Sequence, residues 1–221
     1  MADRPGLTRS IPFGLFLGIM ALDPVLRPIL PDGFDPRWLY GLRSGVALLA
    51  VVFLWRHFHE LKTIRGIRPS HWALATGIGL AVLAAWVSLD IQPLAFAAKD
   101  GFNPLVDGRP HLGLTAMRLA GATLVVPVVE ELFWRSFILR WLHHPKFLTV
   151  DPVSVGLRAL LISSALFATE HRLWFAGLLA GLAYGWLYQR TGNLWPPILA
   201  HAVTNGLLGT YVLVTGAWQF W

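Results

Sequence analysis

The sequence contains no cysteine and few charged residues. Without cysteine, neither a disulfide framework nor a thiolate metal site can form. The absence of cysteine does not indicate whether the compartment is oxidising or reducing. Charged side chains make up 14% of the 221 residues, whereas hydrophobic residues make up 55%. This composition is too apolar for an ordinary soluble fold, so we expect the chain to lie in a membrane.

Long runs without charge indicate how the chain crosses the membrane. Residues 72–89 carry no charge, 173–189 carry none, and 194–221 carry none beyond His201. Because roughly 20 apolar residues in a helix span a hydrocarbon core of about 30 Å, such runs predict transmembrane helices. The first run is interrupted by Asp23 and Pro24, so we interpret it as a retained first helix rather than a signal peptide. The expected spans are 11–30, 38–55, 72–89, 112–142, 155–170, 173–189 and 194–221.

The fold expected is all-α: a polytopic bundle of about seven or eight transmembrane helices, forming a single integral membrane domain over residues 1–221. The longest polar connection is 90–111. Tryptophans gather near the predicted span ends, where amphipathic rings favour the headgroup layer. These are Trp38, Trp55, Trp72, Trp141, Trp195, Trp218 and Trp221.

The charge distribution predicts an orientation. The net charge is +6, but the basic residues are scattered over short connections and form no long patch, which argues against nucleic acid as a partner. By the positive-inside rule, the N-terminus and the basic connections lie in the cytoplasm, and a bacterial inner membrane is the expected location. The basic connections contain Arg56, Lys62, Arg65, Arg68, Arg140 and Lys146, whereas Asp23, Asp32 and Asp35 precede Trp38.

Ionisable residues inside apolar helices mark candidate chemistry, because a charge at depth costs at least about 2.5 to 3.5 kcal/mol. The first such place is 126–135, with Glu130 and Glu131 adjacent and Arg135 one turn later. Successive helix positions differ by about 100°, so the two carboxylates face different directions. Glu131 can pair with Arg135, which leaves Glu130 free to face a cavity. A charge cluster that holds the helix end at the interface is the alternative interpretation.

Two further places pair polar or aromatic residues one helical turn apart. Phe167 and His171 form the first pair, and His201 and Asn205 form the second. An imidazole and a carboxamide in an uncharged stretch need hydrogen-bond partners, so His201 and Asn205 also fit a purely structural role. A carboxylate, two imidazoles and an amide are together a sufficient set to activate water and stabilise an oxyanion.

In order and spacing, these residues resemble the three motifs of the CAAX protease and bacteriocin-processing family of intramembrane proteases, which read EExxxR, FxxxH and HxxxN. Here the motifs are 130–135, 167–171 and 201–205, within a motif-bearing core at 125–206. The first half of the chain matches only as hydrophobic segments, with a narrower similarity to exosortase-associated bacterial members. Ser136 departs from the glycine that members often carry after the arginine.

The resemblance implies an endopeptidase that cleaves a membrane-anchored peptide or protein. It implies Glu130 as the base that activates water, and His171 and His201 as partners that orient water or stabilise the oxyanion. Asn205 would be a further oxyanion donor. Structural roles fall to Glu131, Arg135 and Phe167.

Other protease signatures are absent. His59-Glu60 is not followed by the second histidine of H-E-x-x-H, there is no G-x-S-x-G, and the Asp-Gly pairs at 100–101 and 107–108 lie in the polar connection. Zinc bound by Glu130, His171 and His201 would satisfy common ligand preferences, and the family has been described both as metalloproteases and as glutamate proteases. We favour the glutamate chemistry without a metal cofactor and leave zinc as the alternative.

The topology creates a conflict. If 155–170 and 173–189 both cross fully, His171 lies at the outer face and far from Glu130 and His201. Broken or tilted helices around a water-filled cavity would remove the conflict, and Pro127, Pro196 and Pro197 offer breaks.

Two rival functions come from other classes: a non-catalytic immunity or partner-binding protein that retains the fold, and a proton-coupled transporter that uses Glu130 and the histidines as a relay. The complete motifs argue against a non-catalytic protein, and the lack of an inverted repeat argues against a transporter.

Overall fold

The computed structural model describes residues 4–64, 67–96 and 101–221. Arg65 and Asp100, which the sequence analysis used, lie outside the described residues, as do positions 97–99 of the polar connection. In the described part, the chain forms seven helical rods, of which one has only 12 residues, and the short helix α3 (His59–Lys62), so the expected all-α membrane bundle is confirmed.

Five helices are long and apolar enough to cross a membrane, counted over the described residues: Pro5–Ile29, Pro36–His57, Pro69–Ser88, Leu112–His143 and Trp195–Thr215. They contain α1 (Pro5–Leu26), α2 (Leu39–Leu54), α4 (Pro69–Ser88), α5 to α7, and α10 (Trp195–Thr215). The remaining helices are α3 (His59–Lys62), α8 (Leu157–Ala168) and α9 (Trp174–Thr191).

Short elements join the rods. A hairpin of β1 (Leu105–Val106) and β2 (Arg109–Pro110) turns at Asp107 and Gly108, which both have positive φ as a two-residue hairpin turn requires. The 3₁₀ turns are Arg27–Ile29, Pro36–Trp38, Trp55–His57, Phe147–Thr149, Pro152–Ser154 and Trp218–Phe220.

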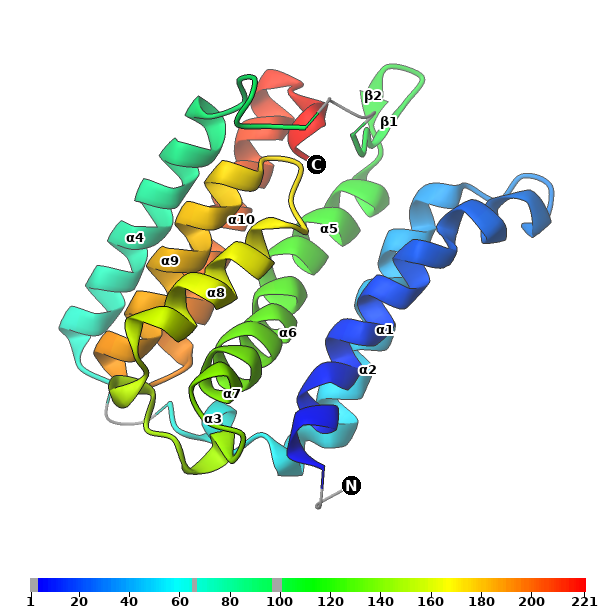
Figure 1. Ribbon diagram of the computed structural model, residues 1–221. Helices are drawn as coiled ribbons and strands as arrows, with labels where there is room; N and C mark the ends of the chain where they lie inside the picture. Colours follow the sequence, from blue (N-terminus) through cyan, green and yellow to red (C-terminus); the bar gives the residue numbers. More distant parts are fainter. Residues whose placement is uncertain (1–3, 65–66, 97–100) are drawn as a thin grey trace.

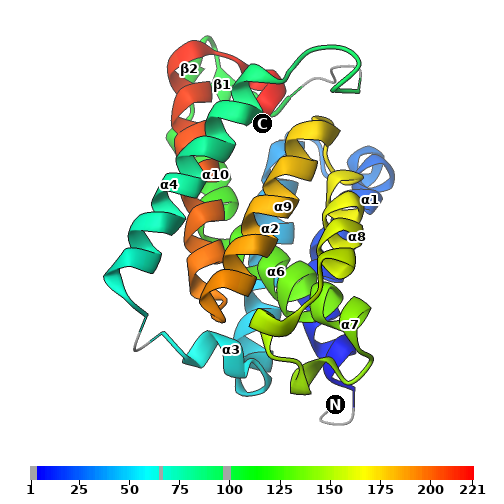
Figure 2. The ribbon, with the colours of Figure 1, turned by 60° about the vertical axis from the view of Figure 1, so that its left-hand side comes forward.

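The rods form two groups on either side of the 112–143 helix (Figure 1). On one side α1 packs along α2; on the other, α10 packs on α4, and α9 lies between α4 and α8. The N-terminus, α3 and α7 (Arg140–His143) lie at one end of the bundle, while the hairpin and the C-terminus lie at the other (Figure 2). We call these the N-terminal end and the C-terminal end.

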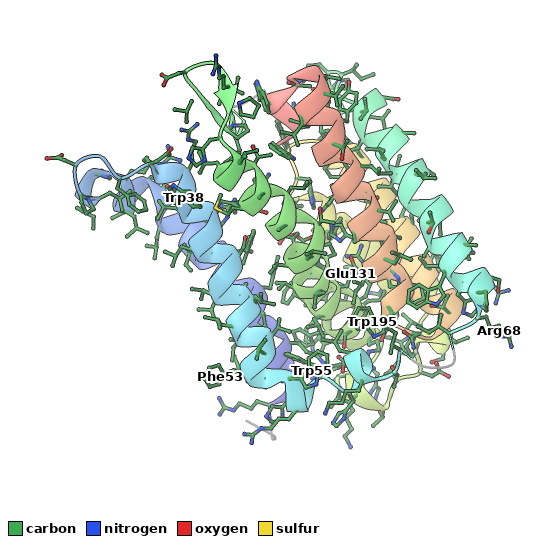
Figure 3. All side chains as sticks on the ribbon, turned by 180° about the vertical axis from the view of Figure 1, so that it is seen from behind. Trp38, Phe53, Trp55, Arg68, Glu131 and Trp195 are labelled. Atoms are coloured by element: carbon green, nitrogen blue, oxygen red, sulfur yellow. The ribbon has the colours of Figure 1, made fainter. Side chains whose placement is uncertain are left out.

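Large apolar side chains cover the outside of the rods. Phe53 on α2 is 84% exposed and points away from the bundle (Figure 3), and Val214 on α10 is 81% exposed. Trp38 lies toward the C-terminal end, while Trp55 and Trp195 lie toward the N-terminal end, as expected for rings at the two headgroup layers. This surface faces lipid.

The expectation that 155–170 spans the membrane was wrong. Helix α8 has only 12 residues, which rise roughly 18 Å against a hydrocarbon core of about 30 Å. The turn after α8 (Figures 1 and 2) carries His171, whose ring meets that of Trp86, two residues before the end of α4, so His171 stays within the depth of the bundle. A short helix, rather than a helix broken at proline, therefore removes the conflict over depth.

Candidate active site

The 112–143 helix changes its winding around the two glutamates. Helix α6 (Val126–Glu131) lies between the π-helical turns η4 (Gly121–Val125) and η5 (Leu132–Leu139), with α5 (Leu112–Ala120) before them. π-helical turns within α-helices occur frequently at functional sites, because they alter which side chains share a face. Glu130 and Glu131 end the six-residue α6 and are both buried.

Pro127 lies in this helix without breaking it. In η4 the N–H of Val126 donates to Gly121 O, five residues back. The next bond in that register would run from residue 127 to Ala122 O, but proline has no N–H. Asn205 of α10 supplies the donor, since its Nδ2 lies 2.9 Å from Ala122 O. The amide predicted as an oxyanion donor therefore also ties α10 to the π-helical turn.

The four residues predicted to be catalytic line one cavity of about 210 Å³, called here the central cavity. Glu130 comes from α6, His171 from the turn between α8 and α9, and His201 and Asn205 from α10. Glu131, the neighbour of Glu130, lies near mid-height of the bundle in Figure 3. The structure thus brings the three sequence motifs together at depth.

Glu130 has a free carboxylate oxygen in this cavity. The residue is 9% exposed, and its Oε2 is buried with no hydrogen-bond partner in the described part of the chain. A buried carboxylate oxygen without a partner is costly, because desolvation is not repaid by a hydrogen bond. Such an atom is available to accept a proton from water or from a substrate.

Glu131 is fully buried and contacts two cationic or basic groups. Its Oε2 lies 3.0 Å from Arg135 Nε, the contact expected from their spacing on the helix. Its Oε1 lies 2.9 Å from His201 Nδ1, a contact that sequence analysis did not anticipate. Glu131 therefore connects the first motif to the third.

Hydrogen bonds fix the orientation of both histidines. His171 Nδ1 lies 2.9 Å from Phe167 O, and His201 Nδ1 lies 2.9 Å from the Glu131 carboxylate. A carbonyl or carboxylate oxygen only accepts, so each Nδ1 carries the proton and each Nε2 of a neutral ring has a free lone pair. Each neutral imidazole thus keeps Nε2 as an acceptor, or as a metal ligand.

Phe167 packs among these polar groups. Its ring centroid lies 4.6 Å from that of His171 and 6.4 Å from that of His201. The guanidinium carbon of Arg135 lies 4.4 Å from the Phe167 centroid, in cation–π geometry. Phe167 therefore lines the central cavity itself, and the other predicted supporting residues, Glu131 and Arg135, contact its lining residues His201 and Phe167.

The comparisons with known proteins agree with this geometry. Residues 112–207 match the family described as type II CAAX prenyl endopeptidase Rce1-like. This range contains all three motifs and the whole of the 112–143 helix, which carries Glu130 and Glu131. Over this motif-bearing part, the chain is similar to CAAX prenyl endopeptidases.

A curated relative extends the similarity beyond the matched range. The "Putative membrane peptidase YdiL" of Bacillus subtilis (strain 168) is 24% identical over 190 residues, which cover 80% of this chain and 70% of the relative. No solved structure matches the chain. Both similarities are to membrane proteases. The narrower similarity to exosortase-associated members stays a prediction.

Several residues around the site carry no sequence signal. The Tyr184 ring stacks on His201 at 5.1 Å between centroids, and its hydroxyl lies 2.7 Å from Thr204 Oγ1. Trp86 of α4 meets His171 edge-on at 5.2 Å. Arg43 and Arg118 also line the central cavity. These residues belong to no motif, and only the packing of distant helices brings them to the site.

A metal site was the alternative left open by the sequence. Among the residues that the structure describes, no three His, Cys, Asp or Glu side chains lie close enough together to hold a metal ion. The free Nε2 lone pairs of His171 and His201 and the free oxygen of Glu130 are nevertheless donors that zinc accepts.

Proposed function

We propose that this protein is an intramembrane endopeptidase that hydrolyses a peptide bond of a membrane-anchored substrate, with Glu130 as the general base. One observation carries the proposal: the unpartnered Oε2 of Glu130 shares a cavity with two histidines whose Nδ1 atoms are already bound. The set has the acceptor for a water proton and the groups that can hold the resulting oxyanion.

The chemistry begins with a water in the central cavity. A volume of about 210 Å³ holds several waters, since each takes roughly 30 Å³ in the liquid. Glu130 removes one proton, and the hydroxide attacks the carbonyl carbon of the scissile peptide bond. The carbonyl oxygen becomes the oxyanion. When the C–N bond breaks, the proton held by Glu130 passes to the leaving amine.

The neighbouring residues stabilise this charge. Protonated at Nε2, His201 can donate to the oxyanion, and the Glu131 carboxylate behind Nδ1 stabilises the imidazolium, as a carboxylate does in a Ser-His-Asp triad. His171 orients the water through its own Nε2, because Phe167 O holds Nδ1. Asn205 has a second N–H beyond the one given to Ala122 O, and this is the further oxyanion donor.

The metal-dependent alternative uses the same residues. In that case Glu130, His171 and His201 would hold zinc, which polarises a carbonyl and lowers the pKa of bound water. Binding requires neutral histidines and an ionised carboxylate, so chelators and mild acid would both remove activity. We favour the direct glutamate mechanism, which needs no metal.

The test uses the full chain, purified and reconstituted in lipid vesicles with a lipid-tethered peptide that carries a fluorophore and a quencher. We expect cleavage that survives exhaustive chelation, far less than one metal ion per chain, and no cleavage by Glu130→Gln. Activity lost on chelation and regained with zinc, in step with stoichiometric binding, would overturn the metal-free mechanism. Failure to cleave any peptide of a diverse library would overturn proteolysis itself, and proton flux in the same vesicles would then favour a transporter.

We also propose that the protein lies in a bacterial inner membrane with its N-terminal end in the cytoplasm. The described basic connections at that end carry Arg56, Lys62 and Arg68, and Arg68 is visible there in Figure 3. Reporter fusions to the N-terminus and to the β1–β2 hairpin should give opposite locations. The same location for both would contradict this orientation.

A further inference from the structure

Two arginines lie inside the bundle on the C-terminal side of the central cavity. Arg43 comes from α2 and Arg118 from α5, and both line the central cavity as well as two neighbouring cavities of about 380 Å³ and about 460 Å³. Trp221 lines all three. The arginines therefore stand where the space around Glu130 joins the cavities toward the C-terminal end.

Both guanidiniums pack on the same tyrosine. The guanidinium carbon lies 4.6 Å from the Tyr40 ring centroid for Arg43 and 4.2 Å for Arg118. Arg43 also lies 4.9 Å from Phe16, and Arg118 lies 5.6 Å from Trp221. Arginines near a membrane interface usually extend into the headgroup layer. Here aromatic rings hold two like charges beside each other and beside the cavity.

Polar atoms of this cluster lack partners. Arg43 Nε, Arg118 Nε and the Tyr40 hydroxyl are buried without a hydrogen bond in the part of the chain that the structure describes, and Tyr40 is 5% exposed. Neither arginine forms an ion pair with a described carboxylate. Both arginines are half-buried, and cation–π contacts offset only part of the cost of taking a cation partly out of water.

The carboxylates that line these cavities are engaged elsewhere or far away. Asp23 binds Arg27 through both oxygens, at 2.7 and 3.0 Å. Glu170 accepts a bond from Trp134 Nε1 at 3.2 Å. Glu130 lies three helical turns from Arg118 on the same helix. The cluster therefore has an excess of positive charge that an anion from outside the chain would balance.

We propose that Arg43 and Arg118 bind a carboxylate of the peptide substrate and thereby select substrates with an acidic group at a set distance from the scissile bond. This inference rests on the proposed function. Arginine presents paired N–H donors that match a carboxylate, and the Tyr40 hydroxyl adds another donor.

The helix that carries Arg118 and Glu130 sets the distance. Arg118, Ala122, Val126 and Glu130 follow one another at intervals of four residues, and all four line the central cavity. At 1.5 Å per residue, the first and last would be roughly 18 Å apart along an ideal α-helix, and the π-helical turn at Gly121–Val125 makes this an upper value because it rises less per residue. An extended peptide covers about 3.3 to 3.6 Å per residue, so the selected carboxylate lies about five residues from the cleaved bond.

The experiment uses lipid-tethered peptides that differ in one group. One set carries a single Glu, placed two to seven residues from the cleaved bond on either side, with an amidated C-terminus. The matched set carries Gln at the same place, and a third peptide carries Gln and a free C-terminal carboxylate. For the wild type we expect kcat/KM to be about tenfold higher or more with the carboxylate than with the amide, with a maximum near five residues.

The arginine variants test where the preference arises. Arg43→Gln and Arg118→Gln should each reduce it, the double variant should abolish it, and Arg118→Lys should retain part of it. Arg158→Gln is the matched control, because it removes the same charge from an exposed arginine on α8 that lines none of the three cavities. An equal loss in Arg158→Gln, or an unchanged preference in the double variant, would overturn the proposal.

Binding separates this inference from the proposed function. Peptide binding is measured with Glu130→Gln protein by fluorescence anisotropy, in phosphatidylcholine vesicles with and without phosphatidylglycerol. Arginine-dependent binding of the Glu peptide without cleavage by the wild type would support the carboxylate site and contradict the proposed protease activity. Cleavage at the same rate with and without the carboxylate would support the protease activity and contradict the carboxylate site. An arginine effect that follows phosphatidylglycerol instead of the peptide would assign the site to lipid phosphate and overturn the proposal.

Discussion

Two buried polar clusters on the 112–143 helix differ in how well their members are paired. The first surrounds the central cavity and leaves Glu130 Oε2, Glu131 Oε2 and both terminal nitrogens of Arg135 without a hydrogen bond in the described residues, although Glu131 Oε2 forms an ion pair with Arg135 at 3.0 Å. The second, called here the N-terminal cluster, comprises Arg9, Glu60, Ser136 and Arg140. The two clusters are close in sequence, because residues 130 to 140 of the long helix contribute side chains to both.

The N-terminal cluster is richly bonded. Arg9 is 1% exposed and holds Glu60 in a two-pronged pair, with Nε at 2.7 Å and a terminal nitrogen at 2.9 Å. Ser136 Oγ contacts the same carboxylate, and Arg140 donates to Ser136 O at 2.7 Å and to Ser136 Oγ at 2.8 Å. Ser136, the departure from the family's common glycine, therefore ties α1 and α3 to the long helix.

The comparison teaches that pairing separates structural charge from reactive charge in this protein. Satisfied hydrogen bonds hold helices together, whereas unsatisfied ones are the groups that a substrate or water can engage. The same Glu-to-Gln substitution should consequently have opposite effects on stability at a paired and at an unpaired carboxylate.

The largest effect is expected for Glu130→Gln, which removes the base and keeps the shape. A general base contributes about 10² to 10⁴ in rate, so kcat should fall by a factor of this order. Because the lost charge has no partner, thermal unfolding in detergent should occur at the wild-type temperature or above it. A large drop in melting temperature would mean that Glu130 is structural.

Glu131→Gln should instead damage the fold. This change leaves Arg135 buried without its carboxylate, and breaking a buried pair costs about 3 to 5 kcal/mol. We expect reduced yield and a lower melting temperature, measured beside Glu130→Gln in the same detergent. Turnover per folded molecule should also fall, because Gln no longer stabilises the His201 imidazolium, but it should fall less than in Glu130→Gln. A stable Glu131→Gln protein with no turnover would move the catalytic role to Glu131.

Glu60 should make the stability depend on acid. Burial raises the pKa of Glu60, but its bonds to Arg9 outweigh burial and hold the pKa below the ordinary 4.5. The ionised carboxylate therefore stabilises the fold fully above about pH 4.5, and this stabilisation is lost as the pH falls through the lower folded pKa. Melting temperatures of Glu60→Gln should be lower at neutral pH and change less between pH 6 and 3 than those of the wild type, as a series at about one-unit steps would show. Parallel curves for the two proteins would contradict this account.

The smallest effect is expected for Asn205→Ala, which leaves Ala122 O without a donor. The cost of an unsatisfied buried carbonyl is about 1 to 3 kcal/mol. Pro127→Ala offers a matched background, because its backbone N–H can supply the missing donor. The stability lost in Asn205→Ala should shrink in the double variant, while any loss of kcat from the missing oxyanion donor should remain. If Asn205→Ala costs the same stability in the Pro127→Ala background as in the wild type, Asn205 does not stabilise the π-helical turn through Ala122 O.

The sequence alone determined the all-α membrane bundle, because uncharged runs of some twenty residues have few other stable states. It also identified Glu130, His171, His201 and Asn205 as one set, since motif order and helical spacing are local properties. The pairing of Glu131 with Arg135 followed from the same spacing, and the structure shows that contact.

Only the tertiary structure decided the rest. The length of α8 set the depth of His171, and the packing of α10 against α6 gave His201 its bond to Glu131. The pairing of Arg9 with Glu60 joins residues 51 positions apart, and the cluster on Tyr40 joins Arg43 to Arg118. The apolar pattern of a helix shows which residues prefer lipid. Because lipid is as apolar as these side chains, the pattern does not determine which helices pair or which polar groups meet across the bundle.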